Sequence, residues 1–413
     1  MANTLLPVHA QDITDTAVVS FKNHCVLARY VDRQYDKLWG QAGAKRGTTI
    51  NLRYPPQYEL RRGNRASPQA SVETYFPVTL GEPIGVDMDF TSQELLLTVD
   101  DFMNRFVKKG TLPVANGVDS DIAALYKKVP NFSGVPGTVP TSIETYLEAT
   151  TILARNGAPV EGDEWAMVID YKSNQKIINA LIAQQNPQGA ISRQWESARM
   201  VSAMGYKWSQ DQNIKIHTVG DWTGLTVLAN AATAQTGSSI VCDGATAATL
   251  KEGDIVTFAN TRSIKPNTVP LNGSGESTGE LKQFVVTADT DAVGAAITIP
   301  ISPSIVTTGA YQNVTQGVAD NSAVLLFGHA NSYSALTSRQ NLAFNKGAFV
   351  LGMVDLPLPG GMDMSARTTD EDAKVSMRFL RGFDITENTF ISRLDLLHVA
   401  ACPRPEFCVR VVG

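Results

Sequence analysis

The sequence predicts an α+β fold in which a mixed body carries an inserted small β-barrel domain. In several segments of the body apolar residues recur every three or four positions, and these helical segments alternate with β-rich ones. Between Trp222 and Ala319 the helical spacing almost disappears, and Thr, Gly, Ala and Val dominate. The mixed pattern returns beyond Ser322, so the β region is predicted to be inserted rather than appended.

The first predicted element is one long amphipathic helix from Asp12 to Trp39. Its apolar residues lie three or four positions apart, at Ile13, Ala17, Phe21, Cys25, Ala28, Val31, Tyr35 and Leu38. A helix with a single apolar stripe needs a neighbour that buries the stripe. The sequence leaves open whether that neighbour is the parent domain or another subunit.

A long, projecting hairpin is predicted next. Thr48–Tyr54 and Ser71–Leu80 are β-rich, and a polar tip of residues 61–68 joins them. The arms contain Tyr, Thr and Arg rather than alternating Val and Leu, so this hairpin alone would be marginally stable. We therefore expect it to pack against something outside its own domain.

A body of mixed helices and strands should follow the hairpin. Thr141 and Glu144 form a capping box that begins a helix, and Asn156-Gly157 should end it. In a later strand Ile214, Ile216 and Thr218 should share one face. The predicted helices are residues 91–107, 141–155, 171–184 and 192–204, and the predicted strands are residues 165–169 and 214–219.

Turn-rich segments divide the inserted region into short strands whose spacing suits a small barrel. The predicted strands are Ser238–Cys242, Asp254–Ala259, Gln283–Ala288 and Ala296–Ile301. Beyond the region Val324–Phe327 continues the mixed pattern, Tyr333–Asn341 has helical spacing, and several strands follow up to Val412.

Composition and charge exclude several classes of protein. The chain has 413 residues, of which 43% are hydrophobic and 18% charged, so it is too apolar for disorder. The net charge of −5 argues against a protein whose main task is to neutralise phosphate. No secretion signal and no apolar run of membrane-spanning length is visible, so we expect a soluble protein made in the cytoplasm. The cysteines lack paired spacing and are expected to be reduced thiols: Cys25, Cys242, Cys402 and Cys408.

The residues that could carry chemistry form no recognisable catalytic pattern. The chain contains no metalloprotease helix, nucleophile elbow or phosphate-binding loop signature. The five histidines are scattered without the spacing of metal ligands: His9, His24, His217, His329 and His398. We therefore expect no catalytic residue, no metal site and no cofactor.

The densest basic cluster lies on the predicted hairpin. It contains Arg53, Arg61, Arg62 and Arg65, interleaved with Tyr54 and Tyr58. Arginines between aromatic residues are one form of nucleic-acid surface. A projecting guanidinium also pairs with carboxylates in a fixed geometry, here on a neighbouring subunit. We favour the second interpretation and predict that these six residues form a subunit interface.

The order of elements and several short segments resemble the tailed-bacteriophage major capsid proteins, of the podophage coat-protein type with an inserted β domain. The resemblance includes Leu250-Lys251-Glu252-Gly253-Asp254-Ile255-Val256-Thr257-Phe258 at the start of the inserted domain. Nearer the end of the chain it includes Asn341–Phe349, Leu356–Pro359, Ser392–Asp395 and Arg404–Glu406. It extends in order over nearly the whole chain, and its strength is the combination of these motifs.

The resemblance implies a coat protein that self-assembles into the hexamers and pentamers of an icosahedral head. The head would enclose the double-stranded DNA genome without sequence-specific binding. A scaffolding protein and a portal are the other partners that it implies. The protein would be located in the virion capsid after assembly in the host bacterial cytoplasm, with no membrane contact.

The resemblance also implies a division of the chain into functional parts. These are an N-terminal helical arm at 1–46, an extended hairpin loop at 47–88, a peripheral domain with a spine helix at 89–162, a capsomer-centre domain at 163–221, an inserted β-barrel domain at 222–320 and a second part of the capsid core at 321–413. The inserted domain departs from the family pattern at Arg262–Gly279, which is rich in glycine and proline.

A different class of function takes the Thr-rich β domain as a binding module. The protein would then be a carbohydrate-binding or other accessory virion structural protein. Such proteins rarely enclose the module within a mixed α/β body, so this interpretation stays the alternative.

Overall fold

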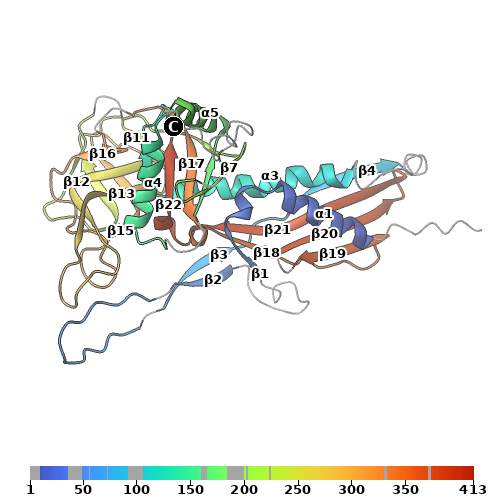
Figure 1. Ribbon diagram of the computed structural model, residues 1–413, viewed down its shortest axis with the longest axis horizontal. Helices are drawn as coiled ribbons and strands as arrows, with labels where there is room; N and C mark the ends of the chain where they lie inside the picture. Colours follow the sequence, from blue (N-terminus) through green and yellow to red (C-terminus); the bar gives the residue numbers. More distant parts are fainter. Residues whose placement is uncertain are drawn as a thin grey trace, which may run out of the picture. The chain divides into compact units, whose positions relative to one another are not determined.

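The chain folds into two compact units, which Figure 1 shows with their elements labelled. The first comprises Met1–Leu52, Phe76–Ile122 and Phe349–Ala401, and the second comprises Arg53–Tyr75, Ala123–Ala348 and Cys402–Gly413. The computed structural model describes residues 10–35, 49–54, 56–71, 73–91, 106–159, 165–183, 200, 203–222, 225–329, 333–370 and 374–413.

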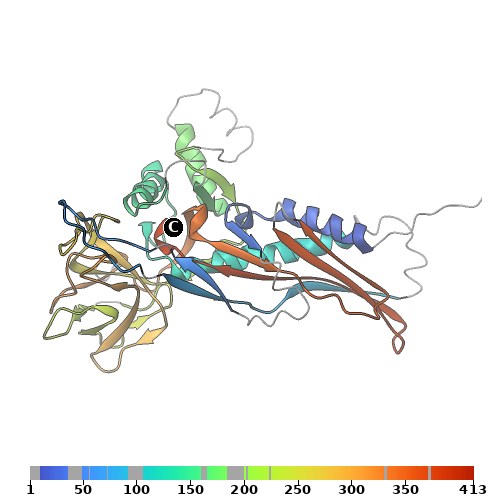
Figure 2. The same cartoon turned by 90° about the horizontal axis from the view of Figure 1, so that it is seen from below.

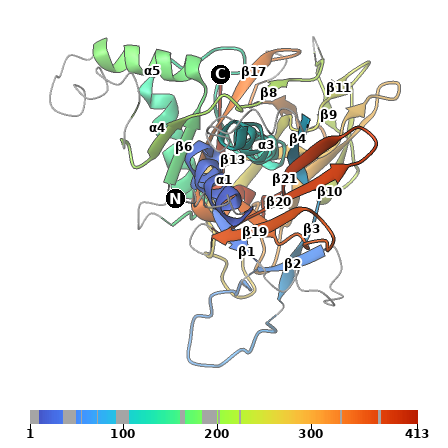
Figure 3. The same cartoon turned by 90° about the vertical axis from the view of Figure 1, so that its right-hand side faces the viewer.

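A mostly antiparallel sheet forms the first unit. Its strand order is β1 (Asp32–Tyr35), β18 (Val350–Val354), β21 (Thr389–Ala401), β20 (Val375–Asp384) and β19 (Met364–Asp370), and β4 (Ile84–Thr91) pairs with β21 as well. Helix α1 (Ala10–His24) packs against β19 and β20 (Figure 3). Its apolar stripe is buried there, so the parent domain supplies the neighbour that the sequence left open.

The prediction of one helix from Asp12 to Trp39 was wrong beyond His24. A short 3₁₀ turn (Leu27–Arg29) and strand β1 follow α1, and residues 36–39 lie outside the described residues. The buried Asp119 carboxylate accepts the N–H groups of Val26 at 2.7 Å and Ala28 at 2.9 Å, donors that a continued helix would have used internally. Strand β1 then gains a parallel partner in β18, so tertiary pairing overrides the helical spacing.

Helix α3 (Lys108–Ala124) was not predicted. Gly110, Pro113 and Gly117 disfavour a helix on intrinsic propensity, and burial of Val114, Ala115, Val118 and Ile122 outweighs that cost. The predicted helix 91–107 lies mostly outside the described residues, because 92–105 are not described and Thr91 ends β4.

A second sheet, in the other unit, forms the body. Its strand order is β5 (Phe132–Gly134), β22 (Cys408–Val412), β17 (Thr337–Asn345), β6 (Trp165–Ile169) and β7 (Lys207–Gln210), and β8 (Ile216–Thr218) pairs with β17. Helix α4 (Ile143–Arg155) contacts β5, β22 and α5 (Tyr171–Ala183). The predicted strand 165–169 is confirmed and fully buried, and the predicted helix 171–184 is confirmed as far as Ala183.

Three local predictions in this body were wrong. The N-cap of α4 is Ser142, whose hydroxyl accepts from the Glu144 N–H at 3.1 Å, so Thr141 does not form the capping box. In β8 the residue that faces inward is His217, while Ile216 is 58% exposed. Tyr333–Asn341 is no helix, because β17 is a central strand with partners on both edges and is buried almost continuously.

The predicted ends of two helices have different outcomes. Helix α4 ends at Asn156-Gly157 as predicted, with Gly157 at a φ of +78°. Of the predicted helix 192–204, residues 192–199 and 201–202 lie outside the described residues. Its last residue, Met204, has a φ of +56° within a turn between Ala203 and Tyr206, so that end of the prediction was wrong.

The third sheet is a six-stranded one that closes on itself. Its strand order is β16 (Val324–Leu326), β12 (Ile255–Ile264), β13 (Ser277–Val286), β15 (Ile297–Ile305), β10 (Gly237–Asp243) and β9 (Leu228–Ala229). Leu228 also bridges to Ala323, next to β16, and this joins the last strand to the first. All four strands predicted in the β region are present, and β16, which follows residue 320, pairs with β12 in the same sheet.

The interior of this barrel is a large apolar cluster that includes Trp222, Phe258, Phe284 and Phe327. Two short strands, β11 (Thr249–Leu250) and β14 (Thr290–Asp291), pair with each other beside it. Among the described residues no helix combines the length and the apolar content that a membrane crossing requires.

Candidate assembly site

The predicted hairpin is present as a two-stranded sheet of β2 (Thr49–Tyr54) and β3 (Thr74–Thr79). We call the segment between its strands, residues 56–71, the arm loop. Arm-loop residues 61–68 are all exposed, as expected for the predicted polar tip of the hairpin.

The three arginines at the tip of the arm loop have different environments. Arg61 donates through its guanidinium to the carbonyl groups of Gly63 and Arg65, the latter at 2.8 Å. Gly63 has a φ of +105°, a backbone conformation that needs glycine. Arg61 therefore closes the turn, whereas Arg62 and Arg65 are exposed and, among the described residues, enter no hydrogen bond or ion pair.

The other three predicted interface residues lie at the base of the arm loop. Arg53 is in β2, and its side chain is outside the description. The Tyr54 hydroxyl donates to the Pro403 carbonyl, and burial raises the pKa of Tyr54 to about 12. Tyr58 is 52% exposed and donates to the Ser71 hydroxyl at 2.8 Å. Tyr54 therefore anchors the hairpin, and Tyr58 braces it.

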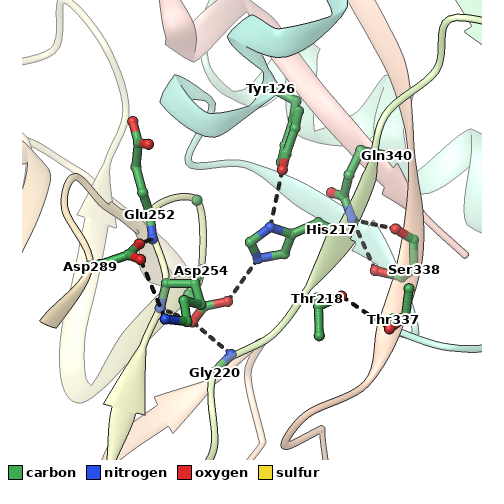
Figure 4. A network of polar contacts seen from close by, with 12 residues as sticks. Tyr126, His217, Thr218, Gly220, Glu252, Asp254, Asp289, Thr337, Ser338 and Gln340 are labelled. Atoms are coloured by element: carbon green, nitrogen blue, oxygen red, sulfur yellow. Dashed lines mark hydrogen bonds and ion pairs between the residues drawn. The ribbon is translucent and has the colours of Figure 1, made fainter. Parts of the chain in front are cut away.

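A buried polar cluster in the same unit was missed by the sequence analysis (Figure 4). His217 of β8 bonds through Nδ1 to the Tyr126 hydroxyl at 3.1 Å and through Nε2 to Asp254 Oδ1 at 2.8 Å. Tyr126 belongs to the 3₁₀ turn Leu125–Lys128, and Asp254 directly precedes β12. The three residues are 4%, 4% and 0% exposed in the order His217, Tyr126, Asp254.

The Asp254 carboxylate has further donors. Its Oδ2 accepts from the N–H groups of Gly220 at 3.1 Å and Lys251 at 2.8 Å. Close by, the Asp289 carboxylate accepts from the Glu252 N–H at 2.7 Å, and this bond lowers the pKa of Asp289 (Figure 4). The turn before β12 is therefore fixed by two carboxylates that bind backbone donors.

Arg410 of β22 adds a buried cation to the cluster. Its Nη1 donates to the Gly253 carbonyl at 2.7 Å, and its guanidinium lies 5.8 Å from the centre of the Tyr126 ring. The side chain is fully buried, and burial lowers the pKa of Arg410 to about 10, so it is charged near neutral pH. Within the described part of the chain its Nε and Nη2 atoms have no hydrogen-bond partner.

The chemistry of the cluster is structural. A tyrosine, a histidine and an aspartate in a row are also found in proton relays, but here all three are buried and bond inward. The cluster ties the turn before β12 to β8 and β22, so it fastens the barrel strands to the body sheet. Among the described residues no group of His, Cys, Asp and Glu side chains could hold a metal ion.

The first unit has its own buried ionic group, centred on Asp395 of β21. Its carboxylate is fully buried and accepts from Arg378 Nε at 3.0 Å, Arg378 Nη2 at 2.7 Å and Arg393 Nε at 2.9 Å. Nearby, His398 Nε2 lies 3.0 Å from Asp121 Oδ2, and burial lowers the pKa of His398. Asp254 and Asp395 both fall in segments that carried the family resemblance, which was the sequence signal available for them.

Comparison with protein families defines the class of this molecule as a bacteriophage coat protein. The sequence model of the family described as "P22 coat protein - gene protein 5" matches residues 1–413, and the chain belongs to that family. It is a tailed-phage major capsid protein that forms the icosahedral head, and its fold is that of phage capsid proteins. It associates with itself in the capsid lattice of the virion.

Solved phage structures resemble the chain at low sequence identity. A structure of Mycobacterium phage Che8 is 10% identical with a TM-score of 0.44, over 94% of this chain and 90% of that one. The cyanophage P-SCSP1u capsid structure is 10% identical with a TM-score of 0.43, over 92% of this chain and 86% of that one. The bacteriophage PhiM1 mature capsid structure is 8% identical with a TM-score of 0.43, over 94% of this chain and 86% of that one. A search of curated proteins gives no match to the sequence.

Proposed function

We propose that the arm loop is a contact through which one coat subunit binds its neighbours in hexamers and pentamers. The observation that carries this proposal is the exposure of Arg62 and Arg65 on a loop whose turn Arg61 closes. A planar guanidinium binds a carboxylate with two parallel hydrogen bonds, which fixes the partner's orientation. Tyr54 and Tyr58 support the loop from its base, and we assign Arg53 to the same interface.

We assign roles to the parts of the chain from its membership of the coat-protein family. The hairpin at 47–88 is the extended loop, α4 is the spine helix of the peripheral domain 89–162, and residues 163–221 belong to the capsomer-centre domain. The inserted barrel begins at 222 and includes β16, so 321–413 supply the second part of the capsid core only beyond that strand. Residues 1–46 form the N-terminal arm.

We also propose partners beyond the coat protein itself, and membership of the coat-protein family supports them. A scaffolding protein and a portal join the subunits during assembly in the host bacterial cytoplasm. Packaged double-stranded DNA lies inside the shell without sequence-specific contacts, in keeping with the net charge of −5. The subunit is not an enzyme, and the internal hydrogen bonds of the Tyr126–His217–Asp254 row support this assignment.

Charge reversal of the two free arginines tests the arm contact. We expect Arg62→Glu with Arg65→Glu to abolish closed shells in negative-stain electron microscopy and sedimentation, because it places like charges opposite the partner's carboxylates. Lys172→Glu with Lys176→Glu, on the exposed side of α5, makes the same change in net charge and serves as the control.

The two outcomes separate the competing interpretations. Normal shells from the arginine variant would contradict the proposed contact. Normal shells that retain less DNA would favour a nucleic-acid surface instead. Arg62→Lys with Arg65→Lys keeps the charge but loses the bidentate geometry, so it should assemble at an intermediate yield.

A further inference from the structure

The arm loop is held against the barrel by backbone pairing. The Leu60 N–H donates to the Val269 carbonyl at 2.8 Å, and the Leu271 N–H donates to the Leu60 carbonyl at 3.0 Å. Leu60 and Pro270 thus form a parallel bridge. Figure 2 shows the blue trace of the loop beside the gold loops of the barrel. The hairpin is therefore attached, at the residue just before its tip, to the inserted region of its own chain.

The arm loop is also braced internally. The Gln69 side chain accepts from the Glu59 N–H at 2.9 Å and donates to the Glu59 carbonyl at 2.8 Å, which imitates one step of a strand pair. Tyr58 bonds to Ser71 across the same gap, and Tyr54 holds the base to Pro403. A loop held in one conformation loses less entropy when it binds a partner.

The barrel segment that receives the loop is itself rigid. We call residues 265–276 the receiving loop. The Lys265 N–H donates to the Glu276 carbonyl at 2.8 Å, and the two side chains form an ion pair at 2.6 Å. The Val269 side chain is 3% exposed, and a Cβ at Gly275 would lie 2.5 Å from Ile264 Cγ2, so the segment is closely packed.

We propose that the receiving loop fixes the arm loop of its own chain in the conformation that binds a second coat subunit, so that the barrel prearranges the surface of contact. The proposal rests on the proposed function of Arg62 and Arg65, and adds that the barrel positions these two arginines. On this surface the charge of Lys265 is paired with Glu276, and Arg61 binds loop carbonyls. Arg62 and Arg65 supply the charge that the carboxylates of the second copy recognise, and the anchor at Leu60 stays closed during assembly.

Proteolysis of the unassembled subunit tests the anchor. Trypsin cleaves after arginine, and the arm loop offers Arg61, Arg62 and Arg65. Leu60→Pro removes the donor to Val269, and we expect cleavage roughly 2- to 10-fold faster, the range that one net hydrogen bond produces. Leu60→Ala keeps the donor and loses a side chain that is 51% exposed, so it should be cleaved like the wild type. Equal rates for Leu60→Pro and the wild type would overturn the anchor.

A disulfide tests whether the anchor stays closed in the shell. Residues paired across neighbouring strands lie within the separation that a disulfide requires, so we choose Leu60→Cys with Pro270→Cys. The four native thiols are buried, which limits competing bonds. We expect the oxidised and reduced forms to assemble with equal yield. Small species from the oxidised form and shells from the reduced form would show that the anchor must open, and would overturn the proposal.

The two proposals fail in different ways. If the arginine variants assemble normally, the proposed function of Arg62 and Arg65 fails, whatever the proteolysis rates are. If those variants do not assemble while oxidised Leu60→Cys/Pro270→Cys also stays small, only the closed anchor fails. Each single-cysteine variant, treated with the same oxidant, controls for damage by oxidation.

Discussion

Two buried histidines, one in each compact unit, pair with aspartates in different ways. His217 has both ring nitrogens bonded, to Tyr126 and Asp254, and the Asp254 carboxylate is fully buried. His398 has one nitrogen bonded to Asp121, whose side chain is 55% exposed. In the described part of the chain its Nδ1 has no hydrogen-bond partner. Each pair consists of a histidine and an aspartate. Water reaches the aspartate of the His398 pair but not that of the His217 pair.

This difference decides what each pair contributes to stability. If His217 lost its aspartate, water could not replace it, and the Gly220 and Lys251 N–H groups would lose an acceptor as well. If His398 lost Asp121, the exposed side of the site would admit water. We infer that the Asp254 pair carries the connection between barrel and body, and that the Asp121 pair has a modest local effect.

The largest effect that we predict follows removal of the buried carboxylate. Asp254→Ala leaves three donors unsatisfied and removes the negative charge that compensates Arg410, so the free energy of unfolding should fall by about 3–5 kcal/mol. Asp121→Ala is the matched variant in the other unit, and about 1 kcal/mol or less is expected. Urea unfolding of the unassembled subunits measures both. Equal losses would contradict the difference drawn between the two pairs.

A smaller effect is predicted at Gly220, whose N–H donates to Asp254. A Cβ at this position would lie 2.1 Å from the Thr249 carbonyl oxygen, so the backbone that carries the donor must shift. We expect Gly220→Ala to cost about 1–3 kcal/mol, the range for overpacking. Gly81→Ala, which has no atom within 4 Å of the added Cβ, is the control for the change itself. A thermal shift for Gly81→Ala as large as that for Gly220→Ala would contradict this explanation.

The smallest predicted effect is the acid sensitivity of the His398 pair. Burial lowers the pKa of His398 below its ordinary value of 6.5, so the unfolded chain binds this proton more readily. The stability that the neutral ring contributes is present above pH 6.5 and is lost as the pH falls through the lower value of the folded state. His398→Gln keeps a donor for Asp121 and does not titrate, so its stability should fall less with acid.

Unfolding experiments between pH 7.5 and 5, at those pH values where the wild type still refolds, measure how the free energy of unfolding changes with pH. Parallel curves for wild type and His398→Gln would show that His398 does not contribute to the acid loss. Tyr54→Phe removes a hydroxyl whose pKa of about 12 lies far above this range. The stability curve of this variant should therefore run parallel to that of the wild type, and the variant serves as the control.

Much of the candidate assembly site could be predicted from the sequence, since the hairpin and its exposed tip depend on local signals. Polar turn residues between two β-rich runs specify a projecting loop, and the arginines must then be near solvent. The roles within the loop could not be predicted. Arg61 and Arg62 are neighbours in the chain, yet only Arg61 reaches the loop carbonyls, because the turn at Gly63 directs it there.

The buried cluster could not be predicted for a different reason. His217 and Asp254 are 37 residues apart, and Arg410 reaches Gly253 from 157 residues away. No periodicity links residues at such distances, and a lone histidine in a strand has no local signal of its partner. The helix predicted to continue past His24 failed similarly, because Asp119 takes its backbone donors from 93 residues away.

The sequence by itself determined the α+β class, the strands of the β region, the hairpin and the resemblance to phage coat proteins. These properties follow from periodicity, turn residues and short motifs, which act over a few positions in the chain. The tertiary structure alone decided where α1 ends, that β17 is a strand, how the barrel closes and which charges are buried together. Each of these depends on pairing and desolvation between distant segments, and the free energy of such contacts exceeds the local preferences that a sequence displays.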